Sequence, residues 1–343
     1  MALENALQLD DKALAGYLES VLEGFKGPLH SEKFKGGQSN PTYRLRAASG
    51  DYVLRRKPPG KLLGSAHAVD REFRLLQALH GSNVPVAKPL HMCSDASIIG
   101  SMFYLMSYVE GRVFWDPSLP ELDNAARTSL YDNLLITLAA IHAIDIDAFG
   151  LSDFGKPGNY FERQVARWSQ QYHDSETRPI AAMDVLIREL PGRCPADDGM
   201  RSLVHGDFRI DNLMFSKDGT AVMAVVDWEL STLGHPLADL GYLCMALRLP
   251  RNPALPGLAG IDRRALGIPS EPEMLARYAA LTGRAIPADW PFVLAFSFFR
   301  LAAIAQGVAK RAVQGNASST QAMQAGQMVE LLAEMGSREL QKA

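Results

Sequence analysis

The sequence contains little cysteine and little net charge. Its 343 residues include three cysteines, Cys93, Cys194 and Cys244, which lie far apart and form no C-x-x-C pair. An odd number of isolated cysteines argues against a disulfide framework or a thiolate metal site and favours reduced thiols. The formal net charge of −3 argues against a nucleic-acid-binding protein and against a protein of the membrane surface.

The sequence also lacks targeting and membrane signals. The run that comes nearest to a membrane span, residues 292–308, is interrupted by Ser297, Arg300 and Gln306, so we expect no spanning segment. The N-terminal stretch MALENALQLDDKAL is acidic and has no basic region before an apolar one, unlike a signal peptide. These features predict a cytoplasmic protein that has neither a nucleic acid nor a membrane as its partner.

What the sequence does contain is a segment that brings two acids and an amide together. Residues 201–240 read RSLVHGDFRIDNLMFSKDGTAVMAVVDWELSTLGHPLADL. The Asp-Gly pair at positions 218 and 219 predicts a β-hairpin, because the tight turn needs a positive φ that glycine adopts without strain. Folding the chain there sets Asn212 roughly opposite Val225, and Asp227 follows about one pair further along. We therefore predict that Asn212 and Asp227 are neighbours.

These residue types suit phosphoryl transfer. Oxygen ligands from an Asp and an Asn favour Mg²⁺ over zinc or a soft metal, so Asn212 and Asp227 are candidate metal ligands. Asp207 lies five residues before Asn212, where its carboxylate can accept a proton from a hydroxyl beside the metal. Phosphoryl transfer needs charge neutralisation on the phosphates and an oriented nucleophile. A single loop acid usually makes only a local turn, and it is the combination that favours chemistry.

Three motifs in this segment carry a family resemblance. They are H-G-D-x-x-x-x-N at residues 205–212, D-W-E at 227–229 and G-x-P-x-x-D-L at 234–240. Over residues 30 to 315 the chain resembles the aminoglycoside phosphotransferase and choline kinase-like family. D-W-E stands where protein kinases carry D-F-G, and no A-P-E segment follows it, which favours a small-molecule kinase.

The resemblance implies a fold and a set of roles. The fold is α+β and protein-kinase-like, with a small antiparallel β-sheet lobe over residues 1–110 and a mainly helical lobe over residues 111–343. The implied cofactors are ATP and Mg²⁺. The implied roles are catalytic base for Asp207, metal binding for Asn212 and Asp227, and bracing of the catalytic loop from a following helix for Asp239.

The nucleotide site is predicted in the small lobe, where short β segments alternate with glycine-rich turns. One turn lies between the first two strands, where the resemblance places the loop over the ATP phosphates. Its glycines let backbone N–H groups approach an anion, and its polar side chains add donors. Taken alone, Gly-Gly in a hairpin is usually only a turn. The turn consists of Gly36, Gly37, Gln38, Ser39 and Asn40.

The third strand of this lobe supplies the cation expected to grip the α- and β-phosphates. The period of two places Val53, Arg55 and Lys57 on one face and Arg56 on the other. Aligning Val-Leu-Arg with the family pattern makes Arg55 the equivalent of its usual lysine, with Lys57 in reserve. Arginine clamps phosphate oxygens in pairs, so the replacement is chemically tolerable.

Two further segments complete the predicted nucleotide site. Residues 67–79 form an amphipathic helix whose Glu72 is either the ion-pair partner of Arg55 or a surface charge. The strand over residues 102–107 leads into the hinge between the lobes. Met106 at its end either contacts the nucleotide or simply fills the core, as methionine usually does. The resemblance makes the hinge backbone the adenine-binding segment, which comprises Met106, Ser107, Tyr108 and Val109.

The large lobe offers fewer signals. The helix over residues 122–144 is apolar around most of its circumference, which is typical of a central buried helix. Its His142 is interpreted as a core or loop-facing histidine rather than a catalytic one. The helix over residues 159–174 presents four residues either to a substrate groove or to the surface, namely Tyr160, Arg163, Arg167 and Trp168.

The charge balance of the two parts bears on the acceptor. Residues 241–343 contain 11 Lys and Arg against 7 Asp and Glu, a balance of +4, whereas residues 1–240 have a balance of −7. A basic lobe suits an anionic substrate better than a polycationic aminoglycoside or choline. The cations considered as contacts are Arg263, Arg264, Arg300, Lys310 and Arg311.

A closer resemblance points in the same direction. RRKPPGKLLGSAHAVDREFRLL and FSFFRLAAIAQG are similar to the phosphotransferase-like domain that is joined to, or encoded beside, some acyl-CoA dehydrogenases. The sequence has no G-x-G-x-x-G fingerprint and no dehydrogenase-like second half, so flavin chemistry is not expected. The association makes a hydroxyl of a hydroxy fatty acid or a hydroxyacyl-CoA a reasonable acceptor.

The sequence thus predicts an ATP- and Mg²⁺-dependent kinase that phosphorylates an alcohol hydroxyl of a small molecule. The alternative is a nucleotide-binding pseudokinase that acts as a regulatory or partner-binding module. Arg55 in place of lysine favours the alternative, whereas the presence of all three loop residues that carry the chemistry opposes it.

Overall fold

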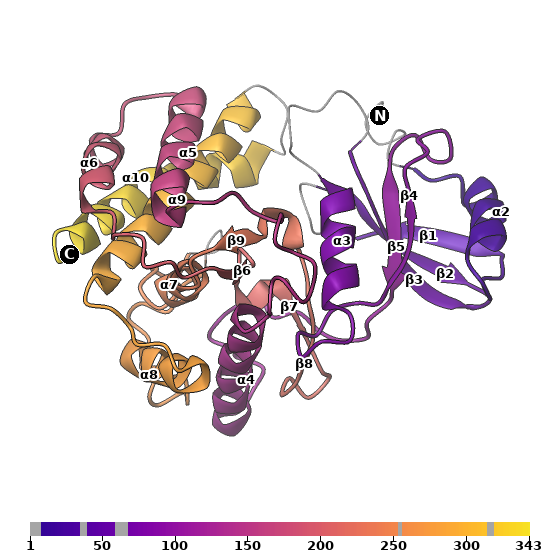
Figure 1. Ribbon diagram of the computed structural model, residues 1–343, viewed down its shortest axis with the longest axis horizontal. Coiled ribbons are helices and arrows are strands. Elements are labelled where there is room, and N and C mark those ends of the chain that lie inside the picture. The colour runs from indigo at the N-terminus through magenta and orange to yellow at the C-terminus, as the bar shows by residue number, and fades with distance from the viewer. Residues whose placement is uncertain (1–7, 35–39, 59–67, 253–255, 314–318) are drawn as a thin grey trace.

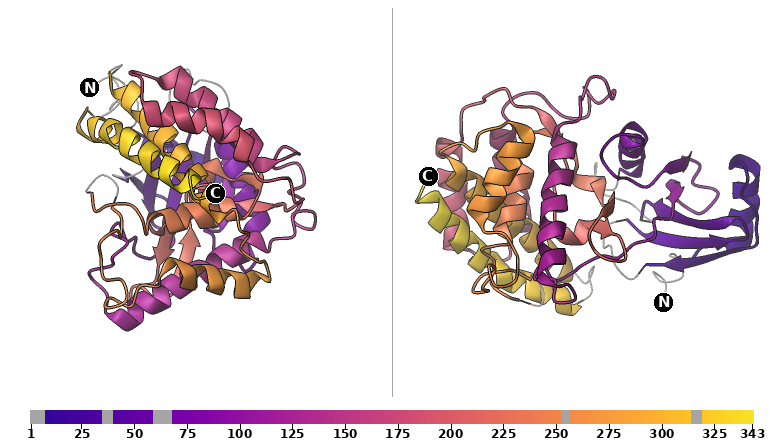
Figure 2. Two further views of the ribbon diagram at one scale, coloured as in Figure 1. Left: turned by 90° about the vertical axis from the view of Figure 1, so that its left-hand side faces the viewer. Right: turned by 90° about the horizontal axis from the view of Figure 1, so that it is seen from below.

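The chain forms two lobes, a small one built on a β-sheet and a large one built mainly of helices (Figure 1). The computed structural model describes residues 8–34, 40–58, 68–252, 256–313 and 319–343. Seen from below, the two lobes lie side by side along the long axis of the molecule (Figure 2). The predicted α+β, two-lobe arrangement is confirmed.

The small lobe is a five-stranded antiparallel sheet with the strand order β1-β2-β3-β5-β4. Its first three strands are the predicted meander. The strands are β1 (Leu29–Lys33), β2 (Thr42–Ala47), β3 (Gly50–Arg56), β4 (Pro89–Cys93) and β5 (Phe103–Ser107). Two helices pack against the sheet, α2 (Asp11–Val21) and α3 (Val69–Leu79).

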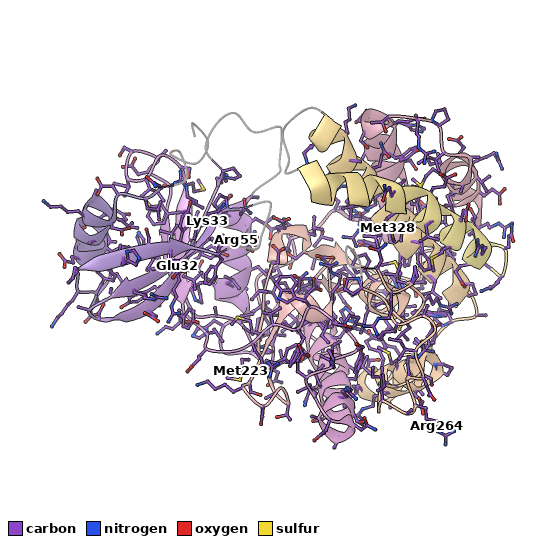
Figure 3. The ribbon with its side chains drawn as sticks, turned by 180° about the vertical axis from the view of Figure 1, so that it is seen from behind. Glu32, Lys33, Arg55, Met223, Arg264 and Met328 are labelled. Carbon is purple, nitrogen blue, oxygen red and sulfur yellow. The ribbon has the colours of Figure 1, made fainter. Side chains whose placement is uncertain are left out.

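The two faces of the sheet serve different purposes. Leu54 of β3 and Leu105 of β5 belong to an apolar cluster that includes Leu18 of α2. Successive side chains of a strand point to opposite faces, so Arg55 and Tyr104 lie on the other face, which α3 covers. The alternation predicted for β3 therefore places Arg55 beneath α3, on the side of the small lobe nearest to the large lobe (Figure 3).

The large lobe surrounds two short β-ribbons with helices. In one ribbon β6 (Ser202–Val204) pairs with β9 (Thr232–Gly234), and in the other β7 (Leu213–Phe215) pairs with β8 (Val222–Val225). The helices are α4 (Asn124–His142), α5 (Tyr160–Ser175), α6 (Ala181–Glu189), α7 (Leu237–Met245), α8 (Glu271–Thr282), α9 (Trp290–Val313) and α10 (Ser319–Leu340). α4 stands on the side of this lobe that faces the small lobe (Figure 2).

α9 corrects the expectation that no segment is long and apolar enough to span a membrane. By length and composition Trp290–Arg311 meets that criterion, but 72% of its most apolar window is buried within the fold. α9 packs along α10 and also contacts α5 and α7. Its apolar character is that of a core helix surrounded by other helices of a lobe.

The chain enters the large lobe immediately after the predicted hinge. Arg112 exchanges two backbone hydrogen bonds with Phe215 of β7, each 2.8 Å long. A Cβ on the preceding residue, Gly111, would lie 2.7 Å from the Phe215 carbonyl oxygen, so the close approach requires glycine. This junction attaches the connection between the lobes to the ribbon that carries the catalytic segment.

Helix packing in the large lobe leaves no room for a side chain at Gly241 of α7, and this can be tested. A Cβ there would lie 2.5 Å from Val293 Cγ1 of α9, whereas Gly16 of α2 has no such neighbour within 4 Å. We expect Gly241→Ala to lower the free energy of unfolding by about 1 to 3 kcal/mol through overpacking. Gly16→Ala, the matched control, should raise it by about 0.5 to 1 kcal/mol because alanine favours the helix. Denaturant unfolding measures both, and equal effects would contradict this packing.

Candidate active site

The catalytic loop follows β6 and is held by a buried carboxylate. Gly206 has a φ of +84°, and a Cβ on it would lie 2.5 Å from the Leu230 carbonyl oxygen, so glycine is required here. Asp239 of α7 is fully buried and accepts hydrogen bonds from the backbone N–H groups of His205 (2.7 Å) and Gly206 (2.8 Å). Asp239 therefore fixes the peptide that precedes Asp207, as the resemblance implied.

His205 connects the catalytic loop to the hairpin. The Nδ1 of His205 accepts from the Asp207 backbone N–H at 3.2 Å. A ring nitrogen that accepts carries no proton, so the proton is on Nε2, which donates to the Val226 carbonyl at 3.0 Å. The ring is fully buried and lies against Trp228, with centroids 4.7 Å apart. This one side chain thus sets the separation between Asp207 and the residue that precedes Asp227.

Asn212 contacts Asp207 directly. Its Nδ2 donates to the backbone carbonyl and to the carboxylate Oδ2 of Asp207, each at 2.8 Å. Since the amide nitrogen is committed to these two bonds, the amide oxygen of Asn212 is left to face a ligand. The Asp207 carboxylate also has Arg209 Nε 3.5 Å from its Oδ1.

The hairpin brings Asn212 and Asp227 together, with a register one residue from the predicted one. Leu213, not Asn212, is paired with Val225, and the Val226 N–H donates to the Asn212 carbonyl at 2.9 Å. The ladder is irregular near Phe215, and such a bulge shifts the pairing beyond it. Asp227 then takes a left-handed conformation with φ 64° and ψ 58°, which turns the chain out of β8.

Arg55 is a cation between the two lobes, with carboxylate partners in both. Its Nε lies 2.9 Å from Glu72 Oε2, and one terminal nitrogen lies 2.6 Å from Asp227 Oδ1. The ion pair between Arg55 and Glu72 is therefore present, in a position where the Glu72 side chain is 3% exposed. Burial opposes the charge of the guanidinium, but its carboxylate neighbours, led by Glu72, raise the pKa of Arg55 on balance.

Lys57, the reserve candidate, takes no part in this cluster. Its ammonium lies 3.4 Å from Asp70 Oδ1, and its side chain is 30% exposed. Arg56 is buried on the opposite face of the sheet, where its Nε donates to Ser101 Oγ at 2.8 Å. The geometry thus favours Arg55 as the phosphate-binding cation.

Glu229 is a third carboxylate near Arg55, and the sequence reasoning missed it. Its Oε2 lies 3.6 Å from Arg55 and accepts from Asn40 Nδ2 at 3.4 Å. The signal was present, because D-W-E places a second acid two residues after Asp227. Asn40, at the end of the predicted phosphate loop, is buried. The rest of that loop lies outside the described residues, namely Gly36, Gly37, Gln38 and Ser39.

The predicted adenine-binding segment follows β5, and one of its groups is already engaged. The Ser107 backbone N–H donates to the Lys88 carbonyl at 2.9 Å, and its hydroxyl accepts from the Lys88 N–H. This N–H is therefore not available to a nucleotide. Met106 pairs with Val53 across the sheet, and Arg44 stacks 4.3 Å from the ring of Tyr108. Val109 follows at the start of the connection, partly exposed.

The donor set at the hairpin fits a magnesium ion. In the described ranges, no group of three or more His, Cys, Asp or Glu could hold a metal by itself. The Asp227 carboxylate and the Asn212 amide oxygen supply two hard oxygen ligands. Mg²⁺ is commonly bound by one or two protein oxygens together with substrate phosphates and water.

The large-lobe side of the loop is cationic and aromatic. Arg300 of α9 is 3% exposed and donates to the Gly206 carbonyl. Its guanidinium carbon lies 5.3 Å from the ring centroids of both Trp168 and Tyr242, and its Nε is buried with no partner in the described part of the chain. Arg167 of α5 is exposed and lies 5.1 Å from the same Trp168 ring.

The other cations considered as substrate contacts do not reach this loop. Arg263 donates to the Leu247 carbonyl, and Lys310 to the Asp174 carbonyl. Arg264 is exposed at the outer edge of the large lobe (Figure 3), and Arg311 is exposed near the end of α9. Charge composition could not separate these residues from Arg300, because it does not show which side chains point toward the loop.

The geometry defines a class of protein. Two aspartates and an asparagine lie in neighbouring segments near a small antiparallel sheet that supplies an arginine, and these are the residue types found in a phosphotransferase with a protein-kinase-like fold. Residues 30–294 match the family model of the phosphotransferase enzyme family. The chain belongs to this family.

Relatives at the level of sequence are longer proteins. The chain is 46% identical to acyl-CoA dehydrogenase family member 10 of Mus musculus over 335 residues, which cover 97% of the chain and 31% of the relative. It is 42% identical to acyl-CoA dehydrogenase family member 11 of Rattus norvegicus, with 96% of the chain and 43% of the relative covered. The chain thus spans less than half the length of these relatives.

Solved structures agree on the fold. A Ralstonia eutropha protein named for aminoglycoside phosphotransferase is 49% identical, with a TM-score of 0.89 and coverage of 98% of this chain and 99% of that one. Spectinomycin phosphotransferase, solved with ADP and spectinomycin, has a TM-score of 0.63 at 11% identity and covers 96% of this chain and 98% of its own. At that identity the likeness shows the fold alone.

The roles of Arg55 in β3 and of Lys57, which follows the strand, can be separated by mutation. We expect Arg55→Met to lower the free energy of unfolding by about 3 to 5 kcal/mol, because Glu72 is left buried without its partner. Lys57→Met, the control, removes a surface pair and should change it by less than about 1 kcal/mol. Denaturant unfolding and calorimetric titration with ATP check the pair. Loss of nucleotide binding in Lys57→Met but not in Arg55→Met would contradict the assignment.

Proposed function

We propose that this chain transfers the γ-phosphoryl group of ATP to a hydroxyl of a small molecule, in the cytoplasm, with Mg²⁺ as its metal. One observation carries the proposal. The Asn212 amide is bonded to Asp207, and the Asn212 carbonyl accepts from the N–H of Val226, the residue before Asp227. Asp227 in turn contacts Arg55. The proposed base, metal ligands and phosphate-binding cation thus lie in one connected group of residues between the lobes.

In this mechanism Asp207 orients the acceptor and takes its proton. The hydroxyl oxygen attacks the γ-phosphorus, the bond from that phosphorus to ADP breaks, and the hydroxyl proton passes to the Asp207 carboxylate. Asn212 donates a hydrogen bond to one oxygen of that carboxylate, and the Arg209 Nε lies 3.5 Å from the other. Catalysis of this kind rests on positioning and charge stabilisation.

Arg55 and the metal ligands act on the nucleotide. Asn212 and Asp227 are the residues that would hold Mg²⁺, which when bound neutralises charge on the phosphates. Arg55 is paired with Asp227 in this structure, so a phosphate must compete with a carboxylate for one of its terminal nitrogens. Its Nε stays with Glu72, which fixes the direction of the guanidinium.

Asp207→Asn tests the base. The variant should fold and bind ATP normally, because an amide has nearly the same shape, but it cannot take a proton. We expect phosphorylation to fall by at least about two orders of magnitude. Steady-state ADP release and calorimetric titration with ATP measure the two properties. Near-normal turnover in Asp207→Asn would refute the assignment.

We further propose that the acceptor is anionic, as a hydroxy fatty acid or a hydroxyacyl-CoA would be. The support is the pair of guanidiniums around Trp168 beside the catalytic loop, together with relatives named for acyl-CoA dehydrogenases. The guanidinium of Arg300 is buried beside this loop, and a buried cation favours a negatively charged partner. An aminoglycoside carries the opposite charge.

Arg167→Met tests the charge preference. Arg167 is exposed and can be removed without emptying the core. We expect the KM for an anionic acceptor to rise by about tenfold or more, as for loss of a hydrogen bond to a charged group, while the KM for ATP stays unchanged. Arg264→Met, at the outer edge of the lobe, is the matched control. Equal effects of the two substitutions would remove the support for an anion site.

The acceptor itself can be found with a panel. ATP consumption with Mg²⁺ is compared among hydroxyacyl-CoAs, hydroxy acids, choline, sugars and an aminoglycoside, with each acyl-CoA paired with its analogue that lacks the hydroxyl. Turnover that requires the hydroxyl and is lost in Asp207→Asn supports the kinase. Turnover on another alcohol but on no hydroxyacyl compound would exclude this acceptor class. Tight ATP binding with no turnover on any member would favour the pseudokinase.

A further inference from the structure

A chain of buried hydrogen bonds runs from α8 to the catalytic loop. The Tyr278 hydroxyl lies 2.7 Å from His142 Nδ1, and His142 Nε2 lies 3.3 Å from Asp239 Oδ2. Tyr278 is 0% exposed, and the side chains of His142 and Asp239 are also 0% exposed. The same Asp239 carboxylate holds the backbone before Asp207. Four separate segments, α8, α4, α7 and the loop, thus meet in one network.

The direction of each hydrogen bond follows from chemistry. Burial lowers the pKa of His142 even though Asp239 opposes this effect, so the ring is neutral at physiological pH and has one proton. An ionised carboxylate only accepts, and although burial raises the pKa of Asp239, its hydrogen bonds, with that from His142 foremost, lower it on balance. The proton is therefore on Nε2 of His142, and Nδ1 accepts from the Tyr278 hydroxyl.

α8 is itself tied down at both ends. Ser270 and Glu273 form a capping box at its start, and Arg277 is paired with Asp132 of α4 at 2.6 Å. Just after its end, Arg284 donates to the His142 backbone carbonyl at 3.3 Å. The Tyr278 hydroxyl is thus presented to the ring from a fixed position.

We propose that Tyr278 and His142 are positioning residues of the active site, acting on Asp207 through Asp239. The Tyr278 hydroxyl selects the histidine tautomer that donates to Asp239. Without this hydroxyl the proton can move to Nδ1, and a lone pair on Nε2 would then face the carboxylate. Asp239 would lose one of its three donors, and the loop before Asp207 would be held less firmly.

The first test is spectroscopic and does not depend on the proposed phosphotransfer. In wild-type protein labelled uniformly with ¹⁵N, His142 should show a protonated Nε2 and an unprotonated Nδ1. Tyr278→Phe should shift both imidazole nitrogens of His142 and the backbone amide signals of His205 and Gly206. Tyr172→Phe is the matched control, because the Tyr172 hydroxyl is buried with no partner in the described part of the chain, and it should leave all four signals in place.

The second test is kinetic. We expect Tyr278→Phe to lower kcat for ATP turnover by about three- to tenfold, as for loss of one buried hydrogen bond, with the KM for ATP unchanged. His142→Gln keeps an N–H donor near the Nε2 position and should retain more activity than His142→Leu. In the His142→Gln background, Tyr278→Phe should have little further effect, because the two residues act on one path. Tyr172→Phe should behave as the wild type.

The outcomes separate this inference from the proposed function. A wild-type protein without turnover would contradict the phosphotransferase proposal, and the imidazole and amide signals would then decide the positioning role alone. Unchanged His142 signals in Tyr278→Phe would overturn the inference, as would equal kcat values for Tyr278→Phe and Tyr172→Phe. If Tyr278→Phe fails to fold, the difference between His142→Gln and His142→Leu decides.

Discussion

The ion pairs of Arg55 with Glu72 and Asp227 are the interactions on which the junction between the lobes depends. The guanidinium binds Glu72 from the small lobe and Asp227 from the large lobe at the same time. A lysine ammonium is a point charge on a flexible stem, whereas the planar arginine fork offers separate N–H groups in fixed directions. Arginine in place of the lysine that the resemblance leads one to expect therefore adds a contact that a lysine could not make in the same way. It lets one residue keep its partner on α3 and still contact Asp227 of the large lobe.

Much of this arrangement could be predicted from the sequence because its signals are local. The Asp-Gly turn predicts the hairpin, and the hairpin makes Asn212 and Asp227 neighbours. The period of two on β3 separates Arg55 from Arg56, and the structure places them on opposite faces. Each of these steps uses residues within about one element of each other, where backbone geometry leaves few alternatives.

The parts that could not be predicted depend on distance or on very short elements. β9 has three residues, too few to show a periodic pattern, and a bulge near Phe215 shifted the hairpin register by one. Tyr278 and His142 are 136 residues apart, so nothing in either stretch indicates the pairing. Glu229 was legible in the motif, but its role as a neighbour of Arg55 required the orientation of the turn.

Three polar side chains of α9 are buried, and each makes a specific hydrogen bond. Ser297 donates to the Val293 carbonyl within the helix, Arg300 to the Gly206 carbonyl, and Gln306 to the Ser175 carbonyl. Apolar contacts between helices tolerate small slides and rotations, since one methyl group can replace another. The hydrogen bonds of Arg300 and Gln306 do not tolerate such movements, because a slide or a rotation of α9 would leave a buried donor unsatisfied. These two hydrogen bonds, nearly two turns apart, fix the position of α9 along its axis and its rotation about it.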